Sequence, residues 1–128
     1  ARYRLADLFL DTFHCNAHTT AAEALWSGLP VLTCQGATMA ARVASSLLSA
    51  VGLPEMITHN PQQYEDQAVH LASHPDELAR LRALLAHNRL STPLFETERQ
   101  VQKIEEIYQH IWRRHLAGLA PETFQISG

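Results

Sequence analysis

Residues 8–10 form a short apolar segment, and five polar side chains lie close together in the sequence after it. They are Asn16, His18, Thr19, Thr20 and Glu23. Each threonine offers a hydroxyl and a backbone N–H, and the histidine can donate from its imidazole. The first N–H groups of a helix have no partner within the helix, and the helix dipole adds positive charge there. If a helix begins here, the donors of His18, Thr19 and Thr20 predict a site for a phosphate or diphosphate.

The same residues also have a purely structural interpretation. Asn16 or Thr19 can cap the helix, Thr20 can bond to its own backbone, and His18 can be satisfied within the turn. Spacing alone leaves both interpretations open. Glycines occur only at positions 28, 36, 52, 118 and 128, so the chain contains neither a dinucleotide-binding fingerprint nor a P-loop.

Short apolar segments alternate with helical patterns along the chain. Residues 8–10, 30–34 and 55–58 predict strands, the first of them buried, and helices are expected between and after them. This alternation predicts an α/β fold with a short parallel sheet and right-handed crossovers. Ligands of such sheets bind beyond the carboxyl ends of the strands, where residues 13–20 are expected to lie.

Several side chains outside this segment have plainer interpretations. Helical apolar spacing predicts core positions for Tyr64, Tyr108 and Trp112. Trp26, directly after the first expected helix, is expected in the core as well. Arg42 can pair with a carboxylate to fix the turn at 35–38, or it can point toward the ligand.

The chain resembles, from residue 2 to about residue 117, the C-terminal catalytic region of the peptide O-GlcNAc transferases, including bacterial homologues that carry tetratricopeptide repeats. The resemblance implies the C-terminal half of the nucleotide-binding lobe of a GT-B glycosyltransferase, which is a partial Rossmann-like lobe. It rests on matches that occur in the same order, namely residues 5–7, 10–12, 15–16, 18–20, 24–26, 28, 30–33, 41–46, 64–65 and 91–95.

This resemblance also implies roles for the polar residues. His18, Thr19 and Thr20 would contact the diphosphate of UDP-GlcNAc, Glu23 would reach the ribose, and Asn16 completes the substrate-binding set. His18 would also stabilise the leaving diphosphate. The family usually has Asp where this chain has Glu23, and Gly-Glu-Thr where it has residues 36–38, Gly-Ala-Thr.

The activity implied is an inverting transfer of N-acetylglucosamine from UDP to Ser or Thr hydroxyls of proteins, without a metal or other cofactor. Two alternatives stay open: a protein O-fucosyltransferase that uses GDP-fucose, and a non-catalytic α/β interaction module. Residues 1–96 are expected to form the C-terminal part of the nucleotide-sugar-binding lobe. A long helix at 97–117 is expected to pack on it, and residues 118–128 are expected to form a tail. The rest of the catalytic region and the tetratricopeptide repeats are expected upstream, so the isolated chain is expected to be inactive.

Composition limits the classes of function. The chain has 128 residues, 46% of them hydrophobic and 18% charged, which suits one globular unit or a piece of one. Its net charge of −3 argues against nucleic-acid binding. Eight histidines form no metalloprotease pair, so no metal site is expected. Neither a signal peptide nor an apolar run of membrane-spanning length is visible in the sequence. Cys15 and Cys34 are expected to be unlinked thiols. These observations together predict a cytoplasmic protein.

Overall fold

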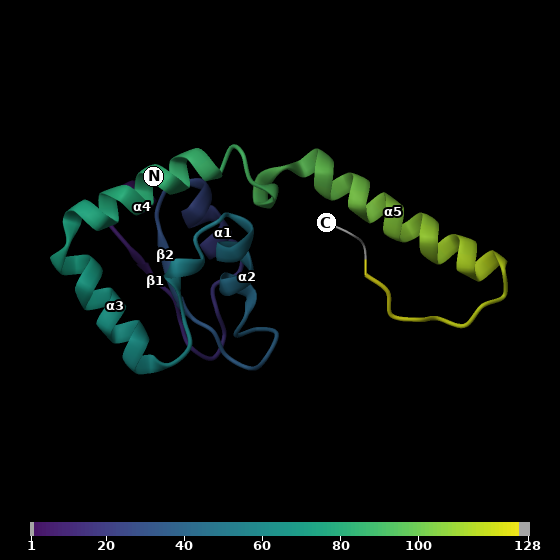
Figure 1. Cartoon of the computed structure of the whole chain (residues 1–128), viewed down its shortest axis with the longest axis horizontal. Coiled ribbons are helices and arrows are strands. Elements are labelled where there is room, and N and C mark those ends of the chain that lie inside the picture. Colours follow the sequence, from purple (N-terminus) through teal and green to yellow (C-terminus); the bar gives the residue numbers. More distant parts are fainter. Residues whose placement is uncertain (1, 126–128) are drawn as a thin grey trace. The chain divides into compact units, whose positions relative to one another are not determined.

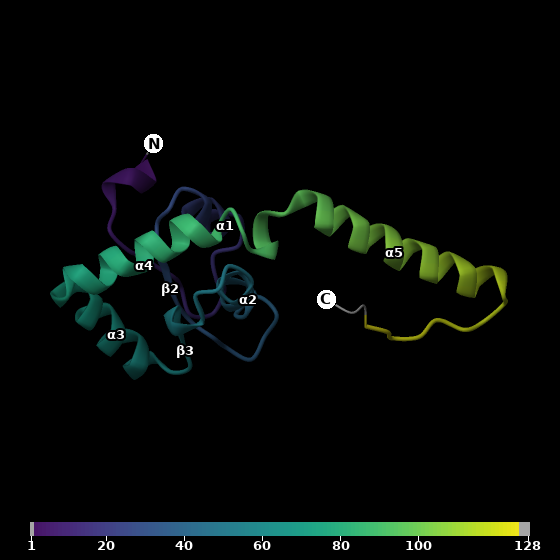
Figure 2. The same ribbon diagram turned by 45° about the horizontal axis from the view of Figure 1, so that its top comes forward.

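The structure is a computed structural model that describes residues 2–125. The chain divides between Phe95 and Glu96 into two compact units. The first unit contains all three strands and four α-helices, and the second contains one long helix (Figures 1 and 2).

The first unit alternates strands and helices as the sequence predicts. Its strands are short, and 3₁₀ turns precede β1, precede β3 and follow α4. In chain order the elements are η1 (Arg2–Leu5), β1 (Phe9–Leu10), α1 (Thr19–Trp26), β2 (Val31–Cys34), α2 (Val43–Ala50), η2 (Pro54–Met56), β3 (Ile57–Thr58), α3 (Pro61–Ser73), α4 (Pro75–Asn88) and η3 (Pro93–Phe95).

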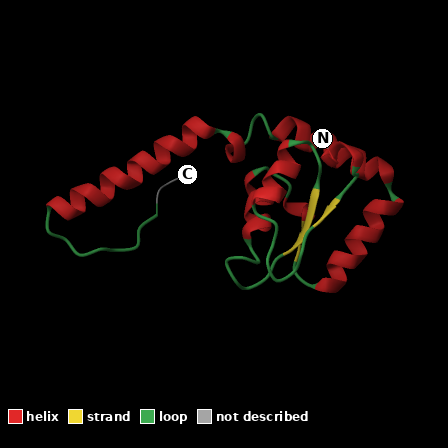
Figure 3. Ribbon diagram, turned by 180° about the vertical axis from the view of Figure 1, so that it is seen from behind, coloured by secondary structure: helices red, strands yellow, loops and turns green. Residues whose placement is uncertain are grey.

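The three strands form one parallel sheet in the order β1-β2-β3. Phe9 pairs with Val31 and Thr33 pairs with Ile57, so β2 is the central strand. All four residues of β2 are buried. The strands lie between the α1–α2 pair and the α3–α4 pair, as the view from behind also shows (Figure 3). The predicted α/β class with a short parallel sheet is therefore confirmed.

Two predictions of burial in the first unit are wrong. Leu10 was expected in a buried strand but is 55% exposed, because β1 pairs with β2 on one side only in the part of the chain that is described. Trp26 was expected in the core and is 53% exposed. It lies at the last position of α1, where its ring packs edge-on against Phe95 at 5.1 Å between centroids.

Helix ends follow the local signals in the sequence. The side chain of Asn60 caps α3 by accepting from the Gln63 N–H at 2.9 Å, and a proline follows the cap. Helices α1 and α2 are followed by Gly28 and Gly52, which have φ values of 83° and 73°. Glycine is favoured at these two positions because other residues rarely adopt positive φ.

The second unit consists of α5 (Thr97–Leu116) and the segment that follows it. The structure begins this helix at Thr97 and ends it at Leu116, one residue before the predicted end. Tyr108 and Trp112 are exposed among the described residues, contrary to the prediction that they are core residues, because the part of this unit that is described holds a single helix and one following segment. Packing of α5 on the first unit stays a prediction, and the last residues of the predicted tail, 126–128, lie outside the described part. Within residues 2–125, no helix is both long and apolar enough to cross a membrane.

Candidate functional site

The carboxyl ends of the parallel strands meet at one edge of the sheet, and two turns cover that edge. Residues 11–18 connect β1 to α1, and residues 35–42 connect β2 to α2. The Asn16 N–H donates to the Ala40 carbonyl at 2.9 Å, which joins the first turn to the second. The second turn is closed by a 2.8 Å bond from the Gly36 N–H to the Ala41 carbonyl. The predicted site residues therefore lie where an α/β sheet binds ligands.

A buried carboxylate holds the first turn in place. Asp11 is 4% exposed and accepts three hydrogen bonds. Its Oδ1 accepts from the N–H groups of Thr12, at 2.8 Å, and Ala17, at 2.7 Å. Its Oδ2 accepts from the hydroxyl of Thr33 on β2 at 2.6 Å. Sequence reasoning missed this role, although an aspartate directly after an apolar strand was the available signal.

Asn16 lies beneath the turn rather than at its surface. It is 3% exposed, and its Nδ2 donates to the Thr12 carbonyl at 2.9 Å. Its Oδ1 is buried and has no hydrogen-bond partner within residues 2–125. Because Oδ1 is an acceptor, it cannot bond to a phosphate oxygen. In this structure Asn16 therefore shapes the turn that leads into α1.

The start of α1 is open to solvent and has no side-chain cap. His18 is the N-cap residue, and no side chain within residues 2–125 bonds to the first N–H groups of the helix. Thr19 and Thr20 follow it, both exposed, and neither hydroxyl bonds to any other described residue. Neither Asn16 nor Thr19 caps the helix, so the capping part of the structural interpretation does not describe this structure. Two hydroxyls and the first N–H groups are thus left to bind an anion.

His18 connects this helix start to the second turn. Its Nε2 lies 3.5 Å from the Ala40 carbonyl oxygen, the same oxygen that accepts the Asn16 N–H. With a proton on Nε2 the imidazole can donate to this carbonyl, while the rest of the exposed ring stays free to face a ligand. The start of α1 thus carries three consecutive polar residues, His18, Thr19 and Thr20.

Glu23 lies one helical turn beyond the threonines. It follows Thr19 by four residues and Thr20 by three, so the three side chains share one face of α1. Its exposed carboxylate accepts a hydrogen bond from the Tyr3 hydroxyl, with Oε2 at 3.1 Å. Four of the five predicted site residues thus lie at the surface of one helix start, and Asn16 lies below it.

Other side chains near this edge make few polar contacts. Arg42 is exposed, and no carboxylate lies within ion-pair distance of it among the described residues. The alternative in which Arg42 fixes the turn by an ion pair is therefore not realised here. Cys15 and Cys34 are free thiols, as predicted.

A tyrosine from α3 braces the turn and has a perturbed pKa. The Tyr64 hydroxyl donates to the Asp11 carbonyl at 2.9 Å, and its ring packs edge-on against Phe13 at 5.0 Å between centroids. Burial, together with the negative charges of Asp11 and Cys34, raises the pKa of Tyr64 from 10 to about 12. The packing of Tyr64 against the core agrees with its predicted core position.

This pKa predicts how stability changes at alkaline pH. The folded chain keeps the Tyr64 proton up to about pH 12, whereas the unfolded chain loses it near pH 10. The stabilisation is therefore complete below pH 10 and is lost as pH rises toward 12. Urea unfolding of wild type and Tyr64→Phe is expected to show a steeper loss of unfolding free energy between pH 10 and 12 in the wild type. Equal slopes would contradict the assignment, and Tyr108→Phe, at an exposed site, serves as the control.

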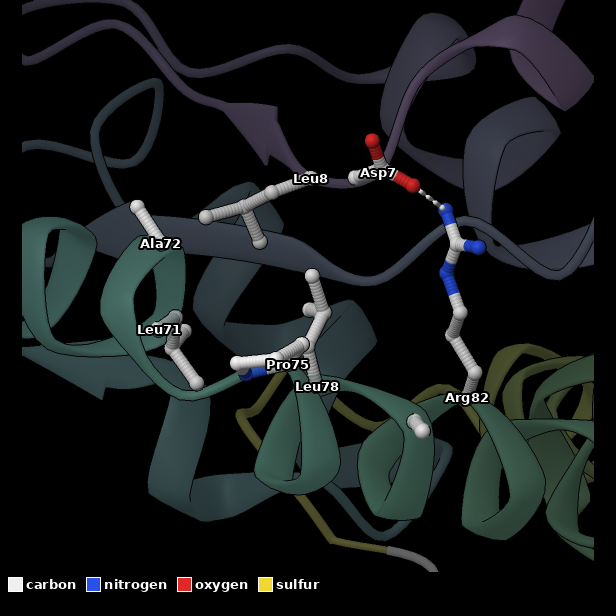
Figure 4. A pocket seen from close by; sticks show the side chains of 8 residues that line it. Asp7, Leu8, Leu71, Ala72, Pro75, Leu78 and Arg82 are labelled. Carbon is white, nitrogen blue, oxygen red and sulfur yellow. Dashed lines mark hydrogen bonds and ion pairs between the residues drawn. The ribbon is translucent and has the colours of Figure 1, made fainter.

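A separate hollow of about 460 Å³ lies at the amino end of β1, away from the polar turns (Figure 4). Its walls are mostly apolar, and Arg82 donates there to the Ala6 carbonyl at 2.6 Å and to Asp7 at 3.0 Å. None of the predicted site residues lines it. The hollow is bounded by Asp7, Leu8, Leu71, Ala72, Pro75, Leu78, Ala79 and Arg82.

Comparison with protein families gives one match that covers most of the chain. The family model described as glycosyl transferase family 41 matches residues 1–104. This range includes the whole first unit and therefore every predicted site residue.

Individual proteins agree with this match. A probable UDP-N-acetylglucosamine–peptide N-acetylglucosaminyltransferase of Arabidopsis thaliana is 42% identical over 95% of this chain and 13% of its own length. The Caenorhabditis elegans protein described by the same activity is 38% identical over 92% of this chain and 10% of its own. A solved structure of a mutant Thermobaculum terrenum O-GlcNAc transferase superimposes with a TM-score of 0.81 at 38% identity, over 87% of this chain and 21% of that one. The chain thus spans only 10–13% of these two curated relatives.

Proposed function

The chain belongs to glycosyl transferase family 41, and from this premise we propose that it is the diphosphate-binding part of an enzyme that transfers N-acetylglucosamine from UDP-GlcNAc to Ser or Thr hydroxyls of proteins. The observation that carries the proposal is the uncapped start of α1. This helix start lies at the carboxyl edge of a parallel sheet and carries His18, Thr19 and Thr20. The two threonine hydroxyls have no partner among the described residues, and the only polar partner of the His18 ring there is the Ala40 carbonyl. Related proteins described as peptide N-acetylglucosaminyltransferases support the choice of sugar nucleotide and acceptor.

The chemistry explains why donors matter at this position. An acceptor hydroxyl attacks the anomeric carbon, the bond from that carbon to the diphosphate oxygen breaks, and negative charge develops on the departing UDP. Donors already aimed at those oxygens stabilise the transition state more than the ground state. We assign this role to His18, Thr19, Thr20 and the first N–H groups of α1, without a metal. Glu23, one turn further, would accept from the ribose hydroxyls.

The proposal also places this chain within a longer protein. These two relatives are about seven to nine times its length, since the matched 123 and 118 residues make up 13% and 10% of them. The remainder of the catalytic region, tetratricopeptide repeats and the protein acceptor are the partners proposed for it, in the cytoplasm. Residues that contact the nucleobase and activate the acceptor hydroxyl would come from that remainder, so the isolated chain is expected to bind the nucleotide without turning it over.

Titration of this chain with nucleotides tests the binding role. Amide NMR spectra with UDP and UDP-GlcNAc are expected to show shifts concentrated in residues 16–23, and smaller or absent shifts with GDP. Equal or larger responses to GDP would favour the alternative that uses GDP-fucose. No response to any nucleotide at millimolar concentration would contradict binding by the isolated chain and leave the non-catalytic module as the better description of it.

A variant of one hydroxyl makes this test specific. Thr20→Val keeps the side-chain shape and removes the donor, so UDP affinity is expected to fall about tenfold, the typical effect of one hydrogen bond to a charged group. Thr123→Val makes the same chemical change in the second unit and is expected to leave the affinity unchanged. Equal affinities for wild type and Thr20→Val would exclude the hydroxyl from the site.

A further inference from the structure

We infer that Tyr3 is a positioning residue for Glu23 and thereby sets how strongly the site holds the ribose of a nucleoside diphosphate. The inference rests on the proposed function. It concerns a residue that the predicted site does not include, on a 3₁₀ turn twenty positions before Glu23 in the sequence.

The contact itself is direct. The Tyr3 hydroxyl donates to Oε2 of Glu23 at 3.1 Å, and this hydrogen bond connects η1 to the exposed face of α1. The Tyr3 ring packs against the hydrophobic core cluster, so the hydroxyl is presented from a partly buried, anchored side chain. An anchored donor fixes the acceptor better than a free one does, because little side-chain freedom remains to be lost.

Glu23 needs such a partner more than a shorter carboxylate would. Its carboxylate is at the end of three rotatable bonds on an exposed helix face, and an unfixed glutamate loses this freedom when it binds a ligand. The bond from Tyr3 engages Oε2 alone. A carboxylate accepts through both oxygens, so Oε1 remains free to accept from a ligand hydroxyl.

The spacing on α1 determines which ligand hydroxyl this is. Glu23 lies one helical turn, about 5.4 Å, beyond the phosphate donors of Thr19 and Thr20. In a nucleoside diphosphate, the group at that distance from the phosphates is the ribose with its two neighbouring hydroxyls. Tyr3 therefore acts on recognition of the sugar of the nucleotide and has no contact with the diphosphate.

Three probes separate this role from a structural one. Binding of UDP, 2′,3′-dideoxy-UDP and inorganic pyrophosphate to the chain is measured by amide NMR for wild type and Tyr3→Phe. We expect Tyr3→Phe to weaken UDP about 3- to 10-fold, less than the loss of a direct hydrogen bond to a charged group because Tyr3 acts through Glu23, and to leave dideoxy-UDP and pyrophosphate unchanged. Equal weakening of all three probes would mean that Tyr3 acts through the fold, and no weakening of UDP would overturn the inference.

Two further variants complete the test. In a Glu23→Ala background, which removes both acceptor oxygens, Tyr3→Phe is expected to have little additional effect on UDP, since the two residues act as a unit. Tyr108→Phe removes an exposed hydroxyl from the second unit and is expected to change nothing. Additive effects of Tyr3→Phe and Glu23→Ala would overturn the coupling.

Failure of the proposed function gives a different pattern. If wild type binds neither UDP nor pyrophosphate, the phosphate site itself is disproved in this chain, and the role of Tyr3 in ribose binding is overturned with it. The Tyr3–Glu23 bond is then still measurable in the ligand-free chain. The carboxyl carbon of Glu23 is expected to shift in ¹³C spectra on Tyr3→Phe, and an unchanged signal would show that the bond is absent.

Discussion

Replacing Asp11 by alanine is expected to lower the free energy of unfolding of the first unit by about 3–5 kcal/mol. The substitution leaves the N–H groups of Thr12 and Ala17 and the hydroxyl of Thr33 without their acceptor. The bond from Thr33 is buried and the other two are partly buried. A fully buried donor without a partner costs about 1–3 kcal/mol, partly buried donors cost less, and small domains have only about 5–15 kcal/mol in total. Urea unfolding followed by circular dichroism measures the loss.

Two companion variants separate hydrogen bonding from other effects at this position. Asp11→Asn keeps the size of the side chain and one acceptor oxygen, so about half of the loss is expected. Asp66→Ala removes an exposed carboxylate from α3 and is expected to change stability by less than about 0.5 kcal/mol. A loss of under about 1 kcal/mol for Asp11→Ala would show that the turn does not depend on this carboxylate.

The second large effect is expected on catalysis. In the longer polypeptide to which we propose this chain belongs, His18→Ala should lower kcat for transfer from UDP-GlcNAc by about 10²–10³-fold, as removal of one transition-state donor does elsewhere. KM for the nucleotide sugar should change much less, because the charge on the diphosphate oxygens grows mainly as the bond breaks. Steady-state kinetics at varied UDP-GlcNAc concentration separate the two parameters.

A histidine far along the sequence provides the control. His87 is exposed on α4, and His87→Ala is expected to leave kcat and KM unchanged. Unchanged kcat in His18→Ala would remove His18 from leaving-group stabilisation. A rise in KM with constant kcat would instead assign it to ground-state binding of the nucleotide.

Local sequence signals predicted most of the first unit. Strand-like apolar segments, the Asn60–Pro61 helix start, and glycines after α1 and α2 act within a few residues, so their effects can be read without the fold. The alternation of strands and helices was enough to predict parallel pairing and the edge at which His18, Thr19 and Thr20 lie. The exposure of Leu10 and Trp26 could not be read this way, because it depends on which neighbours cover each side chain.

The sequence by itself therefore determined the α/β class, the order of elements and a cluster of donors at a helix start, since each depends on residue type and short-range spacing. Only the tertiary structure decided how those donors are presented. Three hydrogen bonds join residues that are far apart in the sequence. The Asp11–Thr33 bond spans 22 positions, the bond from Tyr64 to the Asp11 carbonyl spans 53, and the Tyr3–Glu23 bond spans 20. Such contacts form when the packed sheet and helices bring distant segments together, and no local pattern encodes them.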